Sequence, residues 1–358
     1  MNRTIRLAAL LAPLACVAFT TVARAECKIL QVAEFAVSDR GNRPLLDGMI
    51  NGQPIKVLVD TGATTSVMWE DQARELGLSL VPNPYAHTYG ATGKDRVLQT
   101  SIKHLRIGSL AINDQDIAVI GSSGDHRGSE AALILGENFL ANFTTEFDLA
   151  HGVMRLLRPQ GCQPEQMVYW NKPYSLAELE PTNINDPSIE LMVNLNGKQV
   201  RALLDSGAST SIISTSAARR VGVKVQTDAG TSFGIAGKPI ATSLGVFDDI
   251  QVGDETVRNV TLRIADLFER DKEVQTGSVV AAPVGDFPTM LLGGDFFQSH
   301  RVIVMLKERK LLFTYNGGPI FQVRASGDDM SENAPISGSA PTRETNGNTP
   351  VPGNTPSK

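Results

Sequence analysis

The sequence predicts an all-β protein made of two pseudo-symmetric, β-barrel-like lobes with few short helices. A long segment of the chain is repeated, so one structural unit occurs twice. Each half consists of short β-branched and aliphatic runs broken by Gly, Asn and Asp, which is the pattern of strands and turns. The 358 residues are 42% apolar, enough for two sizeable hydrophobic cores.

The repeat is clearest where residues 51–63 match residues 196–208, at an offset of 145. Both segments begin with Asn-Gly, the strongest short signal for a β-hairpin turn. Both then continue as an alternating apolar strand that ends in an aspartate, Asp60 in the first copy and Asp205 in the second. The two aspartates therefore occupy equivalent positions of a duplicated unit.

The match continues further along both halves. The later matching segments are residues 89–94 with 233–238, 107–108 with 252–253, and 133–139 with 290–296. The last pair has a larger offset, so the second half carries about a dozen extra residues, which we place in a surface loop over residues 266–288.

These patterns divide the chain into segments of different kinds. Helical signal is confined to residues 70–76, residues 216–221 and the turns after Gly136 and Gly293. The tail is rich in Ser, Asn, Gly, Pro and Thr and cannot bury enough apolar surface to become ordered. The expected organisation is a signal peptide (1–25), a first lobe (26–160), a linker (161–181), a second lobe (182–324) and a disordered tail (325–358).

The first 25 residues have the pattern of a secretory signal peptide. Arg3 and Arg6 precede an apolar run, and Ala-Arg-Ala at residues 23–25 supplies the small residues of a cleavage site. No later run reaches the ~18 apolar residues of a transmembrane helix. We therefore expect a periplasmic or secreted protein that has no membrane contact after cleavage. Lipid modification at Cys16 is the alternative.

Charge and cysteine content narrow the possible partners. The formal net charge is -5 and Lys and Arg form no cluster, which argues against a nucleic-acid partner. After removal of the leader, Cys27 and Cys162 remain, and an even pair in an exported chain predicts a disulfide, with two free thiols as the alternative. The cysteines and histidines lack metal-ligand spacing, so we expect no metal and no cofactor.

The residues that follow each aspartate favour catalysis. Thr61-Gly62 and Ser206-Gly207 give each copy a hydroxyl and a glycine, and the glycine permits a tight turn that aims the carboxylate inward. One such turn alone would be an ordinary capped turn. Two at equivalent positions of a repeat can meet about a pseudo-two-fold axis.

Two carboxylates that meet at such a short distance share one proton, because two negative charges there would repel each other. The ionised carboxylate can then take a proton from water while the protonated one polarises a carbonyl group. Hydroxyls at Thr61 and Ser206 can cross-link the two loops through the opposite backbone. No Ser-His-Asp or Cys-His arrangement offers an alternative nucleophile.

With these motifs, residues 33–316 resemble the retropepsin-like and pepsin-like aspartic peptidases. The resemblance is carried by Asp-Thr-Gly-Ala at residues 60–63, Asp-Ser-Gly-Ala at 205–208, and the aliphatic strands that end at Gly136 and Gly293. It implies a bilobal acid-protease fold in which these strands support the active-site loops. The presence of two lobes in one chain is similar to pepsin, whereas alanine at the fourth position of each motif, Ala63 and Ala208, is similar to the retroviral enzymes. The mixture resembles a tandem retropepsin-like bacterial peptidase, expected to be a monomer.

The resemblance also implies a flap that closes over bound peptide. Tyr89-Gly90 is similar to the flap tip of pepsin-like enzymes, and Phe233-Gly234 is its counterpart in the second half. Either aromatic residue could instead pack in a core. The function implied is an aspartic endopeptidase acting on exported polypeptides, and the alternative is a peptide-binding protein that uses the same cleft without cutting.

Overall fold

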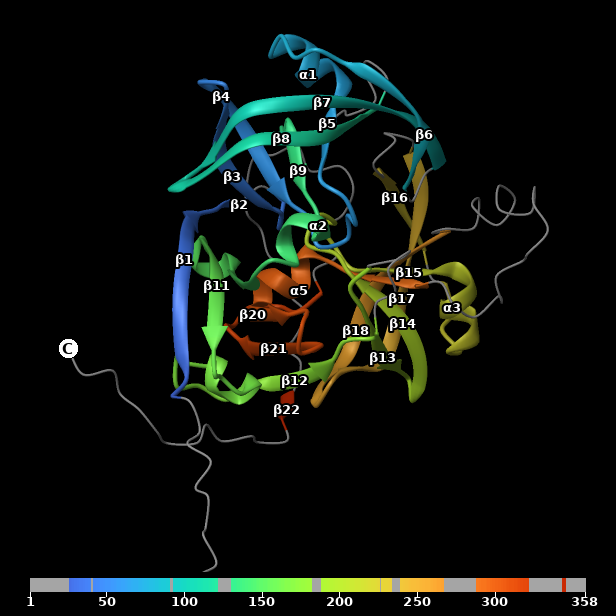
Figure 1. The fold of residues 1–358 in the computed structure, drawn as a ribbon. Coiled ribbons are helices and arrows are strands. Elements are labelled where there is room, and N and C mark those ends of the chain that lie inside the picture. Colours follow the sequence, from blue (N-terminus) through green and yellow to red (C-terminus); the bar gives the residue numbers. More distant parts are fainter. Residues whose placement is uncertain are drawn as a thin grey trace, which may run out of the picture.

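The computed structural model describes residues 26–39, 41–90, 93–121, 130–181, 188–225, 227–233, 239–266, 288–321 and 343–345. It confirms a mostly β, two-lobed fold with few short helices (Figure 1). The described part of the chain forms three sheets, one in each lobe and one between the lobes.

The first lobe is a closed barrel at the top of Figure 1. Its sheet has the order β2-β3-β4-β9-β5-β8-β7-β6, and an additional β3–β7 pairing closes the barrel. The strands in this order are β2 (Ser38–Asp39), β3 (Pro44–Ile50), β4 (Gln53–Val59), β9 (Leu133–Leu135), β5 (Val67–Trp69), β8 (Leu110–Ile120), β7 (Gly93–Ile107) and β6 (Val81–Gly90).

The second lobe repeats this topology. Its order is β16-β17-β13-β14-β19-β15-β18-β22, and an additional β17–β18 pairing closes the barrel. The strands are β16 (Thr227–Phe233), β17 (Pro239–Val252), β13 (Glu190–Leu195), β14 (Lys198–Leu204), β19 (Met290–Leu292), β15 (Ile212–Ser214), β18 (Glu255–Ala265) and β22 (Arg343–Thr345). The duplicated sequence therefore produces a duplicated barrel.

The two Asn-Gly pairs form the turns that the sequence predicts. Asn51 and Gly52 join β3 to β4 with φ angles of 49° and 86°, and Asn196 and Gly197 join β13 to β14 with 49° and 72°. Positive φ at both central residues is the requirement of a type I′ hairpin turn, which Asn-Gly meets at low cost. Each turn sets the register of the strand that leads to the aspartate.

The helices also occur where the sequence predicts them. They are α1 (Glu70–Glu75), α2 (Glu137–Leu140), α3 (Thr215–Arg220) and α5 (Gly294–Ser299). The first two belong to the first half and the last two to the second, so within the described residues short helices recur at equivalent places of the repeat.

A third sheet joins the two lobes and mixes strands from both halves. Its order is β1-β11-β10-β20-β21-β12, and β10 pairs with β20 across the boundary between the halves. The strands are β1 (Lys28–Ala36), β11 (Val153–Gln160), β10 (Thr144–Asp148), β20 (His300–Met305), β21 (Lys310–Tyr315) and β12 (Ser175–Glu178), with 3-10 helices η1 (Leu149–His151) and η2 (Pro164–Met167). Residues 175–178 of the expected linker 161–181 thus lie in this sheet, as β12.

The core runs through this junction without a break. Phe147 of β10 and Phe297 of α5 are fully buried, and their ring centroids lie 4.9 Å apart. Glu146 is also fully buried and accepts hydrogen bonds from Arg155 and Arg301. Removing one partner of a buried ion pair is costly, so these contacts tie the halves together.

Several expected features fall outside the described residues. They include the signal peptide with Cys16, nearly all of the inserted loop (267–287) and most of the tail. Within the tail, residues 343–345 form β22, which pairs with β18, so the expectation of disorder does not hold there. Among the described residues, no helix combines the length and apolar character needed to cross a membrane.

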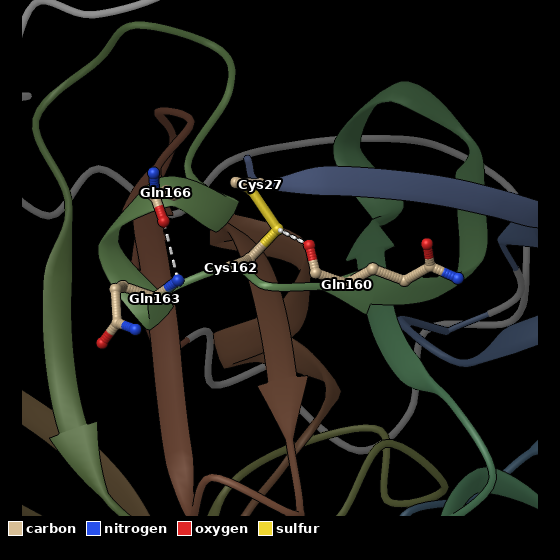
Figure 2. Close-up of a disulfide and its surroundings, with 5 residues drawn as sticks. All are labelled: Cys27, Gln160, Cys162, Gln163 and Gln166. Atoms are coloured by element: carbon tan, nitrogen blue, oxygen red, sulfur yellow. Dashed lines mark hydrogen bonds between the residues drawn. A yellow bond between two sulfur atoms is a disulfide. The ribbon is translucent and has the colours of Figure 1, made fainter. Parts of the chain in front are cut away.

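The predicted disulfide is present between Cys27 and Cys162, with an S–S distance of 2.07 Å (Figure 2). Cys27 directly precedes β1, and Cys162 follows β11, which is the strand that pairs with β1. The bond therefore closes the outer edge of the inter-lobe sheet and holds the start of the first lobe to the segment that leads into the second.

Removal of this disulfide is expected to destabilise the protein by about 2–5 kcal/mol, because a cross-link over 135 residues restricts the unfolded chain. The double variant Cys27→Ser/Cys162→Ser should show the loss as a lower urea midpoint. Reduction of the wild type should lower its midpoint equally and leave the double variant unchanged. Equal midpoints for the wild type and the double variant would contradict the expectation.

Candidate active site

Asp60 and Asp205 stand at the ends of equivalent strands, β4 and β14. Each strand pairs in parallel with the strand that ends before a glycine, β4 with β9 and β14 with β19. The Asp60 N–H donates to the Leu135 carbonyl at 2.9 Å, and the Asp205 N–H donates to the Leu292 carbonyl at 2.9 Å. The aliphatic-Gly strands thus fix the backbone of both aspartates.

The turn after each aspartate is closed by its own carboxylate. Asp60 Oδ1 accepts hydrogen bonds from the N–H groups of Gly62 at 2.8 Å and Ala63 at 3.2 Å. Asp205 Oδ1 accepts the corresponding bonds from residues 207 and 208 at 3.0 and 2.9 Å. One oxygen of each carboxylate is therefore held by the backbone, as in an Asx turn.

The two carboxylates meet across the pseudo-two-fold axis. They hydrogen-bond to each other, and each lies against the glycine of the opposite turn. A Cβ atom added to Gly62 would lie 2.6 Å from Asp205 Cγ, and one added to Gly207 would lie 2.4 Å from Asp60 Cγ. Any side chain at either glycine would therefore collide with the opposite carboxylate.

Thr61 and Ser206 cross-link the two loops through four buried hydrogen bonds. Thr61 Oγ1 donates to the Leu204 carbonyl at 2.7 Å and accepts from the Ser206 N–H at 2.9 Å. Ser206 Oγ donates to the Val59 carbonyl at 2.8 Å and accepts from the Thr61 N–H at 3.1 Å. These are the cross-links that the sequence predicts, and they hold the carboxylates at a fixed separation.

Comparisons with known families agree with this geometry in both halves. Residues 46–142 match the family described as gag-polyprotein putative aspartyl protease. Residues 191–296 match the family described as aspartyl protease. The chain belongs to the retropepsin-like aspartyl proteases. A comparison with curated proteins gave no significant match.

Each active-site loop of this aspartyl protease rests on the turn after an aliphatic-Gly strand. The first active-site loop (residues 60–66) and the second active-site loop (residues 205–211) make the same contacts. The N–H groups of Gly136 and Gly293 donate to Ser66 Oγ at 3.0 Å and Ser211 Oγ at 2.9 Å. Added Cβ atoms at the two glycines would lie 2.6 Å from the backbone of these loops. The glycines are thus required by close backbone approach.

Ser66 and Ser211 are site residues that we did not single out from the sequence. They follow the aspartates by six residues in each copy, so the repeat itself contains the signal that could have identified them. Arg43 is a second addition. Burial lowers the pKa of its guanidinium, while attraction to Asp60 and Glu130 opposes this shift, so a cation lies near the protease dyad.

The dyad is electrostatically asymmetric. Burial raises the pKa of Asp60, and hydrogen bonds from Gly62 and Asp205 oppose that rise. Burial and the negative charge of Asp60 together raise the pKa of Asp205 well above its ordinary value. Two buried carboxylates in contact share one proton, because both cannot ionise together.

The backbone of the predicted flap is a β-hairpin. Strands β6 and β7 pair up to Tyr89 with Lys94 and Gly90 with Gly93. In the second lobe Phe233 pairs with Pro239 at the end of β16 and β17, and Gly234 lies outside the described residues. Across the described chain, no group of three or more His, Cys, Asp or Glu could hold a metal.

Proposed function

We propose that the protein is an aspartic endopeptidase that hydrolyses peptide bonds of exported proteins through a water molecule activated by Asp60 and Asp205. The observation that carries this proposal is the buried, hydrogen-bonded pair of carboxylates at equivalent positions of two lobes, both with a raised pKa. Paired carboxylates with separated pKa values are the arrangement of general acid and base.

We assign the shared proton to Asp205, because the charge of Asp60 raises its pKa further, and the reaction follows from that assignment. Ionised Asp60 accepts a proton from water as the water oxygen bonds to the scissile carbonyl carbon. Asp205 meanwhile donates its proton toward the carbonyl oxygen, which gives a neutral tetrahedral diol. The proton held by Asp60 then passes to the amide nitrogen, the C–N bond breaks, and one diol hydroxyl returns its proton to Asp205. The dyad ends as it began, and no covalent intermediate forms.

The proposal that the substrates are exported proteins rests on the leader pattern of residues 1–25 of this chain, together with its disulfide. A disulfide between Cys27 and Cys162 suits an oxidising compartment, which supports a periplasmic or secreted site of action. One chain supplies both halves of the dyad, so we propose that the active species is a monomer. The flap role of Tyr89 and Phe233 belongs to the same proposal.

The function is tested by incubating the mature wild-type protein with an unfolded, reduced protein substrate at mildly acidic pH. We expect new peptide termini in the substrate interior, as an endopeptidase produces, and loss of cleavage with pepstatin. A peptide-binding protein would retain the substrate without creating termini. Retention without cleavage at any pH would therefore replace the peptidase proposal by the binding one.

The pH dependence of cleavage is expected to lie at milder acidity than that of pepsin. Pepsin-like enzymes carry a hydroxyl residue at the fourth motif position that can hydrogen-bond the carboxylate, whereas here Ala63 and Ala208 offer only backbone N–H groups. Loss of a donor to the charged form raises a carboxylate pKa. Burial shifts the pKa of Asp60 in the same direction, above the ordinary 3.8.

Activity should fall below the pKa of Asp60, where no base remains, and above the pKa of Asp205, where no acid remains. A profile of kcat/KM against pH for the free enzyme measures both limits. Activity confined to strongly acidic solution would contradict this expectation.

A further inference from the structure

Asp295 occupies in the second lobe the position that Asn138 occupies in the first. Both residues lie two positions after the glycine that supports an active-site loop. Asn138 Oδ1 accepts hydrogen bonds from the N–H and Oγ–H of Ser66, both at 2.8 Å. Asp295 Oδ1 accepts the Oγ–H of Ser211 at 2.6 Å, and the Ser211 N–H lies 2.9 Å from both carboxylate oxygens. One lobe thus uses an amide where the other uses a titratable carboxyl.

A short chain of hydrogen bonds connects Asp295 to the dyad. Ser211 donates its single hydroxyl proton to Asp295, so its oxygen is free to accept the Gly293 N–H at 2.9 Å. Gly293 directly follows Leu292, whose carbonyl accepts the Asp205 N–H at 2.9 Å. The backbone position of Asp205 therefore depends on how firmly Asp295 holds Ser211.

The carboxylate of Asp295 is buried, with 3% of the residue exposed, and its hydrogen-bond donors are neutral. They are the N–H and hydroxyl of Ser211 and the Phe296 N–H at 2.9 Å. Burial raises the pKa of Asp295 to about 6, and these donors oppose the rise. The carboxyl therefore changes charge in mildly acidic solution, within the range proposed for the peptidase.

Charged groups on the elements packed against α5 are engaged elsewhere. On β10, Glu146 binds Arg155 and Arg301, and Asp148 binds His151 of η1. On β20, His300 contacts Glu255 at 3.0 Å. Within the described residues, therefore, the hydrogen bonds of Asp295 include none to a cation. Its ionised form is a buried charge held by neutral donors alone, which burial makes more costly than the neutral form.

We propose that Asp295 is a positioning residue for Asp205, and that its ionisation loosens the second active-site loop while the first loop, held by Asn138, is unaffected. This inference deepens the proposed peptidase function and rests on it. The neutral carboxyl resembles the Asn138 amide, since one oxygen accepts both Ser211 donors and the other carries a proton. The ionised carboxylate has no equivalent in the first lobe.

The sign of the effect follows from the direction of the shift. A carboxyl whose pKa is higher in the folded protein than in the unfolded chain favours folding below the unfolded value, near 4, and loses this contribution as the pH rises through about 6. The second lobe should accordingly be firmer at pH 4.5 than at pH 7.5. A shift of about two pH units corresponds to about a hundredfold change in the equilibrium constant.

The test is hydrogen exchange of the backbone amides in the mature protein at the two pH values, corrected for intrinsic exchange rates. We expect protection of residues 205–211 to fall by up to about 25-fold from pH 4.5 to 7.5, since pH 4.5 lies just above the unfolded pKa, while residues 60–66 of the same molecules keep theirs. Asp295→Asn should abolish the fall, and Asn138→Asp should transfer it to the first loop. Comparing the variants with the wild type removes the contribution of dyad titration, which all three share.

Activity provides the second readout. With Asp295→Asn, the alkaline limit of kcat should move to higher pH, with KM little changed. A variant whose loop protection becomes independent of pH but whose pH profile of kcat is unchanged would show that Asp295 is structural only. Loop protection in the wild type that does not depend on pH would overturn the proposal even if cleavage is robust. Absence of cleavage would instead refute the peptidase function, and the exchange data would still decide the loop coupling.

Discussion

Replacing Asp60 or Asp205 by asparagine is expected to lower kcat by at least about a thousandfold, with KM nearly unchanged. The Asp60→Asn variant would lack the base that takes the proton from water, and the Asp205→Asn variant would lack the acidic proton. Asparagine keeps the size of aspartate and offers one oxygen to the N–H groups of Gly62 and Ala63, or to those of residues 207 and 208, so the turns should survive. The loss should therefore reflect chemistry and not misfolding.

The matched control is Asp47→Asn on β3, where an exposed carboxylate pairs with Lys56 at the surface. Exposed pairs contribute little, so this variant should keep wild-type kcat. Thermal unfolding at neutral pH should show that both dyad variants are at least as stable as the wild type, because each removes one of two mutually repelling buried groups. A dyad variant that retains a tenth of the wild-type kcat would disprove the assignment.

The barrels and the dyad were predictable because their signals are local and occur twice. The Asn-Gly turns set the strand register by themselves, and the aspartates follow at fixed spacing. Repetition then converts a weak signal into a specific one, since a single Asp-Thr-Gly turn is common. The same argument places Gly136 and Gly293 under the active-site loops, although only the structure shows that contact with loop backbone is what excludes a side chain.

The inter-lobe sheet was not predictable, because its pairings join distant parts of the chain. Strands β10 and β20 come from different halves, and β12 lies in a segment rich in turn residues that resembles a linker. The local sequence pattern of such a strand does not identify the strand with which it pairs. Loop-closure entropy allows such long connections at small extra cost, so chain distance does not exclude the pairing.

The asymmetry of the site also lay beyond the sequence pattern. Asn138 and Asp295 align in the repeat, but both residue types are ordinary in turns, and their difference acquires meaning only once Asp295 is seen to be buried against Ser211. In the same way, the unequal pKa values of Asp60 and Asp205 follow from burial and mutual contact, which equal motifs cannot encode.

Loss of the loop cross-links is expected to have the second largest effect. Thr61→Val keeps the shape of the side chain but removes the donor to the Leu204 carbonyl and the acceptor of the Ser206 N–H. Both partners are buried, and each unsatisfied buried polar group costs about 1–3 kcal/mol, so the variant should lose about 2–6 kcal/mol of folding free energy. Ser206→Ala removes the equivalent pair of bonds, to Val59 and Thr61.

The control Thr61→Ser retains the hydroxyl that the second lobe uses at this position, and should cost only the lost methyl group, about 1 kcal/mol. The two side chains make separate pairs of bonds in one network. The double variant Thr61→Val/Ser206→Ala should be less destabilised than the sum of the single variants, because loops loosened by one change let water reach the groups that the other leaves unpaired. In both single variants kcat should fall at least about tenfold, because the two carboxylates would no longer be held at one separation. Urea unfolding and kcat, measured on the same samples, test both expectations. Wild-type stability in Thr61→Val would mean that the cross-links do not hold the loops. Full additivity of the two losses in folding free energy would mean that the two hydroxyls act independently.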